Sequence, residues 1–154
     1  MNEGPRRVVT GLDAGGRSCI LIDDRRPIAF PGGQFVWRSR TSPADNSGNE
    51  DAGAEPFNRS AIHDREGSSF ALFTFKPEDG LTEVGMHATD TIDYVVVLQG
   101  RIEFSTETGK VELAAGDLLV DRGVVHGWRA IGDEPAMTAV VMVPANPVGK
   151  GGTL

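Results

Sequence analysis

The chain has 154 residues with 22 acidic and 15 basic side chains, and its formal net charge of -7 disfavours binding to nucleic acid. This length suits one folded domain with a core of its own and leaves no room for a second. No apolar run approaches the roughly 20 residues that cross a bilayer, and the N-terminal residues lack the apolar stretch of a signal peptide. We therefore expect a cytoplasmic protein that binds neither nucleic acid nor membrane, with its one cysteine, Cys19, unable to form an internal disulfide.

Short apolar runs between turn-forming residues dominate the chain. It contains 20 glycines and 9 prolines, and the apolar residues come in pieces of about five to eight, which is typical of many short strands. No amphipathic helix is expected. The predicted strands are, in chain order, 18–23, 34–39, 69–75, 93–98, 101–106, 110–114, 117–121, 126–131 and 137–143.

A polar and acidic stretch, TSPADNSGNEDAGAEPFN, separates the second predicted strand from the third. Its composition predicts a solvated loop or arm, with a segment that covers a pocket or spans a dimer as the alternative. We divide the chain into an N-terminal arm with strands that join a barrel (1–60), the barrel itself (61–145) and a flexible tail (146–154).

The clearest strand pattern lies in the second half of the chain. Within 101–106, Ile102 and Phe104 alternate with charged or polar residues, as in a strand with one buried and one wet face. The segment 107–109 predicts a hairpin turn into 110–114. The strands that follow are expected to continue an antiparallel meander, which favours a sandwich or small barrel over a parallel sheet. The predicted fold class is therefore all-β.

Two of the three histidines stand at boundaries between a turn and a strand, where barrel sites are built. They are His87 and His126, and two imidazoles that point inward there can bind one ion. The alternative is that both are polar residues at the barrel mouth, hydrogen-bonded to Asp90 or Asp93 without a metal. The third histidine, His63, lies in a polar segment and is expected at the surface.

His87 and Asp93 can meet only if the chain turns between them. They are six residues apart, and on one continuous strand they would lie about 20 Å apart, whereas metal–ligand distances are near 2 Å. The segment 89–91 has turn-forming chemistry. We therefore expect His87 to end one strand and Asp93 to begin the next, on which Asp93, Val95 and Val97 share a face.

The segment from His87 to Gly100 resembles the first motif of the cupins, which reads G, five residues, HxH, three or four residues, E, six residues, G. Asp93 followed by YVVVLQ and Gly100 fits its last part, with Asp in place of Glu. His87 matches the first histidine of the motif, and Thr89 stands where the second would be. The HxTDTxDY form is similar to that of a subgroup of small single-domain cupins found near enzymes of small-molecule metabolism.

The segment GDLLVDRGVVHGWRA is similar to the second cupin motif, which reads G, five residues, PxG, two residues, H, three residues, N. It keeps Gly116, Gly123 and His126. It lacks the proline, is one residue shorter before the histidine, and has Ala130 in place of the asparagine. The resemblance covers about residues 70–143.

The resemblance implies a jelly-roll barrel, the double-stranded β-helix of the cupins, here with an N-terminal strand-and-loop arm and often dimeric. It also implies one divalent transition metal (Fe, Mn, Ni or Zn), whose matching ligands here are His87, Asp93 and His126. Asp reaches about 1.5 Å less far than Glu, so Asp90 is the second candidate carboxylate and the candidate catalytic residue. The alternative for Asp90 and Asp93 is that they form the turn and begin the strand. Thr89 and Trp128 are expected to line the pocket, although core packing is the alternative for Trp128.

Two functions compete on these residues. The first is a metal-dependent enzyme that acts on a small organic molecule by decarboxylation, dehydration, isomerisation or dioxygenation, with Asp90 or Asp93 moving a proton. The second is a non-catalytic barrel that binds a small molecule without a metal. The sensory half of a transcription factor is disfavoured because the sequence has no helix-turn-helix segment. We expect a homodimer, since the family is often dimeric and open sheet edges invite pairing.

Overall fold

The structure is a computed structural model that describes residues 4–26, 32–57, 67–77 and 85–148. Its described part contains ten β strands and no α helix. The strands are β1 Arg6–Leu12, β2 Ser18–Arg25, β3 Gly32–Ser39, β4 Ser68–Phe75, β5 Thr91–Gln99, β6 Arg101–Thr106, β7 Lys110–Ala114, β8 Leu118–Asp121, β9 His126–Ala130 and β10 Ala136–Pro144. The all-β prediction is confirmed. No helix that could span a lipid bilayer occurs among these residues.

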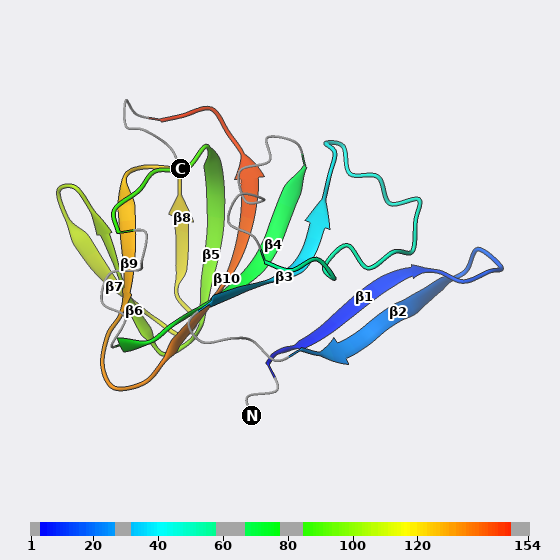
Figure 1. Cartoon of the computed structure of the whole chain (residues 1–154), viewed down its shortest axis with the longest axis horizontal. Coiled ribbons are helices and arrows are strands. Elements are labelled where there is room, and N and C mark those ends of the chain that lie inside the picture. Colours follow the sequence, from blue (N-terminus) through cyan, green and yellow to red (C-terminus); the bar gives the residue numbers. More distant parts are fainter. Residues whose placement is uncertain (1–3, 27–31, 58–66, 78–84, 149–154) are drawn as a thin grey trace.

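The strands form three antiparallel sheets, which Figure 1 shows side by side. A five-stranded sheet has the order β3-β4-β10-β5-β8, a three-stranded sheet has the order β7-β6-β9, and β1 pairs only with β2. The two larger sheets build the barrel. In Figure 1 the β1–β2 hairpin projects beyond the β3 side of the five-stranded sheet.

The core lies between the inner faces of the two larger sheets. One apolar cluster, Phe35, Ala71, Val95, Val140 and Met142, belongs to the five-stranded sheet. A second cluster joins Val97 and Ala136 of that sheet to Ile102 and Ala130 of the three-stranded sheet. Trp128 of β9 packs against both clusters and so connects the sheets.

The expected meander is wrong in one respect. The β6–β7 hairpin forms as predicted, but the chain then crosses to the other sheet, where β8 pairs with β5, and returns so that β9 pairs with β6. This crossing brings the end of β8 and the start of β9 close to the start of β5. It is the jelly-roll connection, in which strands near in sequence belong to different sheets.

All nine predicted strands are present, and the structure adds β1, which the sequence analysis missed. The acidic arm agrees with its prediction as far as residue 50, because residues 41–50 are exposed. The prediction agrees again at residues 54–56, which are exposed, but it is wrong at Gly53 and Phe57. Gly53 is buried, and Phe57 packs against Phe35 of the core with ring centroids 5.2 Å apart.

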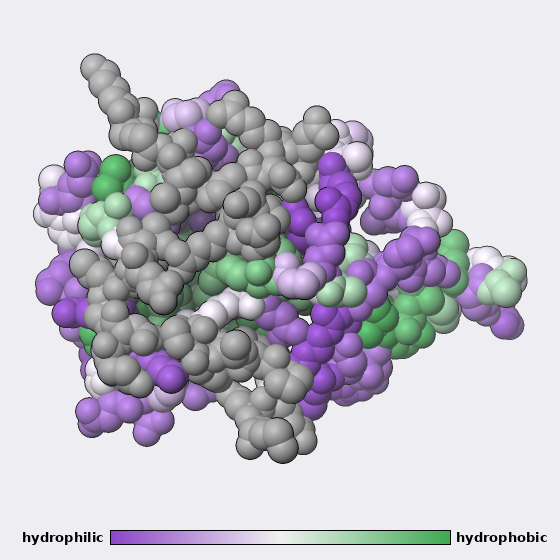
Figure 2. Space-filling view, viewed as in Figure 1, coloured by the Kyte–Doolittle hydropathy of each residue, from purple (hydrophilic) through white to green (hydrophobic). Residues whose placement is uncertain are grey.

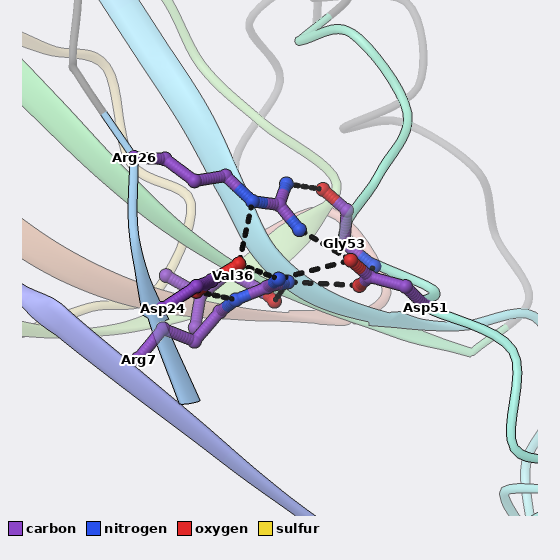
Figure 3. A network of polar contacts seen from close by, with 6 residues as sticks. All are labelled: Arg7, Asp24, Arg26, Val36, Asp51 and Gly53. Carbon is purple, nitrogen blue, oxygen red and sulfur yellow. Dashed lines mark hydrogen bonds and ion pairs between the residues drawn. The ribbon is translucent and has the colours of Figure 1, made fainter. Parts of the chain in front are cut away.

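A buried network of ion pairs fixes the base of the hairpin (Figure 3). Arg7 of β1 donates hydrogen bonds to both oxygens of Asp24, to both oxygens of Asp51 and to the carbonyl oxygen of Val36. Arg26 pairs with Asp24 and Asp51 and donates to the carbonyl oxygen of Gly53. The network therefore ties the hairpin to the acidic arm and to β3.

Candidate functional site

His87 and His126 lie side by side at the open end of the three-stranded sheet. Each donates its backbone N–H to the carbonyl oxygen of the other, at 2.8 and 2.7 Å, and this pair forms an isolated antiparallel bridge. Residues paired in this way project their side chains from the same face. The imidazole centroids are 4.4 Å apart. His126 is only 2% exposed and His87 is half-buried, so solvent reaches the pair from the His87 side.

Both imidazoles are held at the same ring nitrogen. Nδ1 of His87 lies 3.2 Å from the carbonyl oxygen of Gly85, and Nδ1 of His126 lies 2.7 Å from that of Val124. A carbonyl oxygen only accepts, so Nδ1 carries the hydrogen in both rings. In the neutral tautomer Nε2 then carries no hydrogen, and this is the atom through which such a histidine binds a metal or accepts a proton.

Asp121, at the end of β8, is a site residue that the sequence analysis missed. Its side chain is fully buried, and Oδ2 lies 2.8 Å from Nδ1 of His126. Its Oδ1 accepts hydrogen bonds from the backbone N–H groups of Gly123 and Val124, at 3.0 and 3.2 Å. Asp121 therefore shapes the turn that presents His126 and places a carboxylate behind the ring. An Asp two residues before a Gly at a strand end is a turn signal that could have identified it.

Gly123 lets two turns of the chain come together at the site. Its φ is 77°, a left-handed conformation that favours glycine. A Cβ at this position would lie 2.3 Å from the carbonyl oxygen of Thr89 and 2.8 Å from that of Thr91. The turn before β9 thus packs directly on the turn before β5, which brings the segments of His126 and Asp93 together.

Asp93 faces Asp121 across paired strands. The predicted turn between His87 and Asp93 is present, because β5 begins at Thr91. The pKa of the Asp93 carboxyl is raised to about 6, chiefly by burial and also by the negative charge of Asp121, against the lowering effects of the Thr91 hydrogen bond and the charge of His126. Oδ1 of Asp93 is buried and has no hydrogen-bond partner among the described residues.

His126 lies among charged and aromatic neighbours. Burial lowers the pKa of the imidazole, but the carboxylate of Asp121, the carbonyl of Val124 and the charge of Asp93 outweigh this effect, and the pKa is raised overall. The ring stacks on Phe104 at 5.4 Å and meets Trp128 edge-on at 5.9 Å. Trp128 thus packs both against the core and against the candidate site, and its role in a pocket stays a prediction.

The remaining predicted residues lie in the turn before β5 or outside the described residues. Thr89 is buried, and its hydroxyl accepts a hydrogen bond from that of Thr91 at 2.9 Å. Asp90 is half-buried, and its carbonyl oxygen accepts from the backbone of Ala145. Its catalytic role stays a prediction. His63 lies outside the described residues.

The donor chemistry fits a divalent transition metal at two positions. In their neutral forms the imidazoles of His87 and His126 can bind a metal through Nε2, and imidazole suits Fe, Ni and Zn. Within the described ranges, however, no group of three or more His, Cys, Asp or Glu side chains gathers as a metal site requires. The full set of His87, Asp93 and His126 as metal ligands therefore stays a prediction.

Comparisons with known proteins agree with the fold. The family described as "Cupin domain" matches residues 71–143. "Phomopsin biosynthesis cluster protein C'" of Diaporthe leptostromiformis is 33% identical over 135 residues, which cover 81% of this chain and 70% of that protein. "Cupin-domain-containing oxidoreductase srdB" of Neurospora crassa is 26% identical over 152 residues, covering 94% of this chain and 76% of that protein. A solved cupin 2 conserved barrel domain protein of Salinispora arenicola is 18% identical, with a TM-score of 0.45, and the match covers 60% of this chain and 72% of that one.

Proposed function

Because the chain belongs to the cupin superfamily, we propose that it is an oxidoreductase-type cupin that acts on a small organic molecule beside His87 and His126. The observation that carries the proposal is the paired imidazoles, each held by a carbonyl oxygen at Nδ1. The name of the Neurospora crassa relative supports the reaction class.

A metal in this proposal would be held by His87 and His126 through Nε2 of each ring. It would supply Lewis-acid chemistry to a substrate bound beside it. The chain's own groups hold the substrate. Oδ1 of Asp93, which is buried and lacks a hydrogen-bond partner among the described residues, is suited to accept a hydrogen bond from a substrate hydroxyl or amine. The rings of Phe104 and Trp128 beside His126 favour an apolar or planar substrate body.

Four reactions were open from the sequence: decarboxylation, dehydration, isomerisation and dioxygenation. Of these, dioxygenation is the one that belongs to the oxidoreductases. The names of the two Neurospora crassa relatives, both called oxidoreductases, therefore favour it as a proposal for this chain. Fold alone does not choose among the four.

The second candidate is a barrel that binds a small molecule without a metal and without turnover. It is favoured by the lack, within the described ranges, of three potential ligands that gather as a metal site. In this case His87 and His126 are hydrogen-bonding groups for the ligand. The two candidates differ in a measurable property, the metal content of the purified protein.

Elemental analysis of protein purified without added metal tests the proposal. We expect about one transition-metal ion per chain in the wild type and its loss in His87→Ala and in His126→Ala, because two imidazoles are the strongest donors at the site. Circular dichroism checks that both variants keep the β fold. His63→Ala, which changes the remaining histidine, is the matched control and should keep the metal.

Two results would contradict the metal-dependent function. A wild-type protein free of transition metal that still binds small molecules supports the second candidate. Equal metal content in the wild type and in both histidine variants places the ion elsewhere. Oxygen uptake with candidate substrates, measured on the metal-loaded protein, then tests the reaction class.

A further inference from the structure

One row of inward-facing side chains crosses the five-stranded sheet at the level of the candidate site. The pairing register aligns one buried residue from each strand, in the order Arg38, Ser69, Met142, Asp93 and Asp121. Met142 belongs to the apolar core, so the row lies on the inner face of the sheet. The row therefore has a cation at one end and the two carboxylates of the candidate site at the other.

Arg38 faces inward because of an irregularity in β3. The pairing of β3 with β4 shifts between Phe35 and Trp37, so that Val36 is an extra residue. A shift of one residue moves the side chains that follow it to the other face of the sheet. Without it Trp37 would face the interior and Arg38 the solvent. No other position in the described strands of this sheet carries Lys or Arg.

The guanidinium of Arg38 is suited to bind a carboxylate. Its side chain is 6% exposed, and its Cζ lies 4.9 Å from the centre of the Phe35 ring. An arginine that stacks on an aromatic ring is held in one orientation, and its N–H groups form a fork that matches the two oxygens of a carboxylate. In this structure Nη1 donates to such a group, Oε2 of Glu55, at 3.0 Å.

Glu55 can give way to another carboxylate. Its side chain is 45% exposed and belongs to the acidic arm, where residues 54–56 are exposed. Figure 2 shows a mostly hydrophilic surface in the region of the arm. Glu55 also pairs with Arg40, which is 64% exposed. It therefore keeps a cationic partner near the solvent when it leaves Arg38.

We propose that Arg38 binds the carboxylate of the substrate inside the barrel, in place of Glu55, and that the substrate is a small organic acid. This inference rests on the proposed function, because it assigns a substrate class to that site. The strands of Arg38 and Asp93 are three spacings apart, about 14 Å at about 4.8 Å each. The long arginine side chain covers part of this distance, and the body of the acid covers the rest.

The order of residues in the row also fixes the orientation of the acid. Its carboxylate would be repelled by Asp93 and Asp121 if it lay beside them. The neutral side chains of Ser69 and Met142 stand between these carboxylates and Arg38. The acid is therefore bound with its negative charge at Arg38 and its reacting end toward the histidines, an arrangement in which opposite charges meet and like charges stay apart.

Isothermal titration calorimetry of the full chain with benzoate tests the proposal, and benzamide is the neutral probe of the same shape. Benzoate should bind the wild type more tightly than benzamide. Arg38→Met should weaken benzoate binding roughly tenfold or more, because it removes charge-assisted hydrogen bonds, and should leave benzamide binding unchanged. Arg40→Met is the matched control: Arg40 also pairs with Glu55 but is exposed, so this variant should bind benzoate like the wild type.

A second variant tests the exchange of carboxylates. Glu55→Gln removes the competing negative charge and keeps the shape of the side chain, so it should tighten benzoate binding roughly threefold. It also decides the matter if circular dichroism shows that Arg38→Met does not fold. Each titration is repeated after chelation of metal, and the loss on Arg38→Met should be the same, which separates a carboxylate at Arg38 from one bound to a metal ion.

Three results would overturn the proposal, and each would leave Arg38 as an anchor of the arm alone. They are benzoate binding no tighter than benzamide binding in the wild type, equal benzoate binding by folded Arg38→Met and the wild type, and no gain in Glu55→Gln. Failure of the proposed function is a separate result, because a protein without metal or oxygen uptake still binds benzoate through Arg38.

Discussion

Two regions of this molecule bury charged side chains, and they do so in different ways. At the hairpin base, Arg7 is 8% exposed and is bonded to two carboxylates and a carbonyl oxygen. In the barrel, Asp93 and Asp121 face each other with one histidine between their charges, and Oδ1 of Asp93 has no hydrogen-bond partner in the described part of the chain.

The difference separates a structural role from a functional one. A buried charge with all its hydrogen-bonding groups satisfied joins segments of the chain, as Arg7 joins the hairpin, the arm and β3. A buried carboxylate held against a like charge costs stability and persists where it serves binding or chemistry. The comparison therefore predicts that substitution of Arg7 at the hairpin base lowers the stability of the fold, whereas substitution of Asp93 in the barrel raises it.

The largest effect is expected at Arg7. Arg7→Met removes the cation and leaves Asp24 and Asp51 with Arg26 as their remaining partner in the network. Loss of one partner from a buried ion pair costs about 3 to 5 kcal/mol, and because both carboxylates are partly exposed we expect about 3 kcal/mol. Urea unfolding followed by circular dichroism measures the change.

Arg6→Met is the matched control for Arg7. Arg6 is the preceding residue and also bonds both oxygens of an aspartate, Asp23, but this pair is exposed. Exposed pairs contribute little to stability, so the variant should unfold like the wild type. Equal destabilisation by the two substitutions would contradict the distinction between paired burial and surface pairing.

The next effect is expected at Asp93 and has the opposite sign. Its folded pKa of about 6 lies above the ordinary value of 3.8, so ionised Asp93 destabilises the fold, and Asp93→Asn removes that cost. Above pH 6 the variant should be more stable than the wild type by up to about 3 kcal/mol, at about 1.36 kcal/mol per pKa unit. The gain should shrink as the pH falls and vanish below 3.8. Metal-free protein is used at each pH.

Asp117→Asn is the control for this measurement, because Asp117 is an exposed residue next to β8. Its substitution should not add stability at any pH. A loss of stability in Asp93→Asn at pH 8 would show that Asp93 has a stabilising partner, and the barrel would then bury its charges as the hairpin base does.

The smallest effect is expected on the pKa of the His126 imidazole. Asp121→Asn keeps an oxygen that accepts from Gly123 and Val124 but removes the negative charge beside His126. The two effects of Asp121 that oppose burial are then lost, and the pKa of His126 should fall from its raised position. The ¹H–¹³C signal of the ring, followed by NMR across a pH range, reports it. An unchanged pKa would mean that the Val124 carbonyl and the charge of Asp93 hold it without Asp121.

Sequence reasoning was strongest where a property depends on neighbours along the chain. Alternation along β5 correctly predicted that Asp93, Val95 and Val97 share the buried face, and turn chemistry correctly predicted the bend after His87. It failed at Asp121, whose importance comes from pairing with Asp93 across strands distant in sequence. For the same reason it predicted a meander where β8 crosses to the other sheet.

The N-terminal strand was missed for a local reason. Its sequence RRVVTGL has an arginine pair, a short apolar run and a glycine, and a bulge between Val9 and Thr10 breaks its register. Arginine is an unexpected residue at an inward position of a strand, yet Arg7 is buried there because Asp24 and Asp51 neutralise it. Only the folded arrangement brings these carboxylates together.

The close packing at Gly123 has a consequence for engineering. Because glycine at position 123 lets the turn before β9 touch the carbonyl oxygens of Thr89 and Thr91, this contact involves neither the His87 side chain nor the His126 side chain. We expect that His87 and His126 can be replaced by other metal-binding residues while the distance between their Cα atoms is kept. This end of the barrel is therefore suited to the design of other sets of metal-binding side chains, provided that position 123 stays glycine.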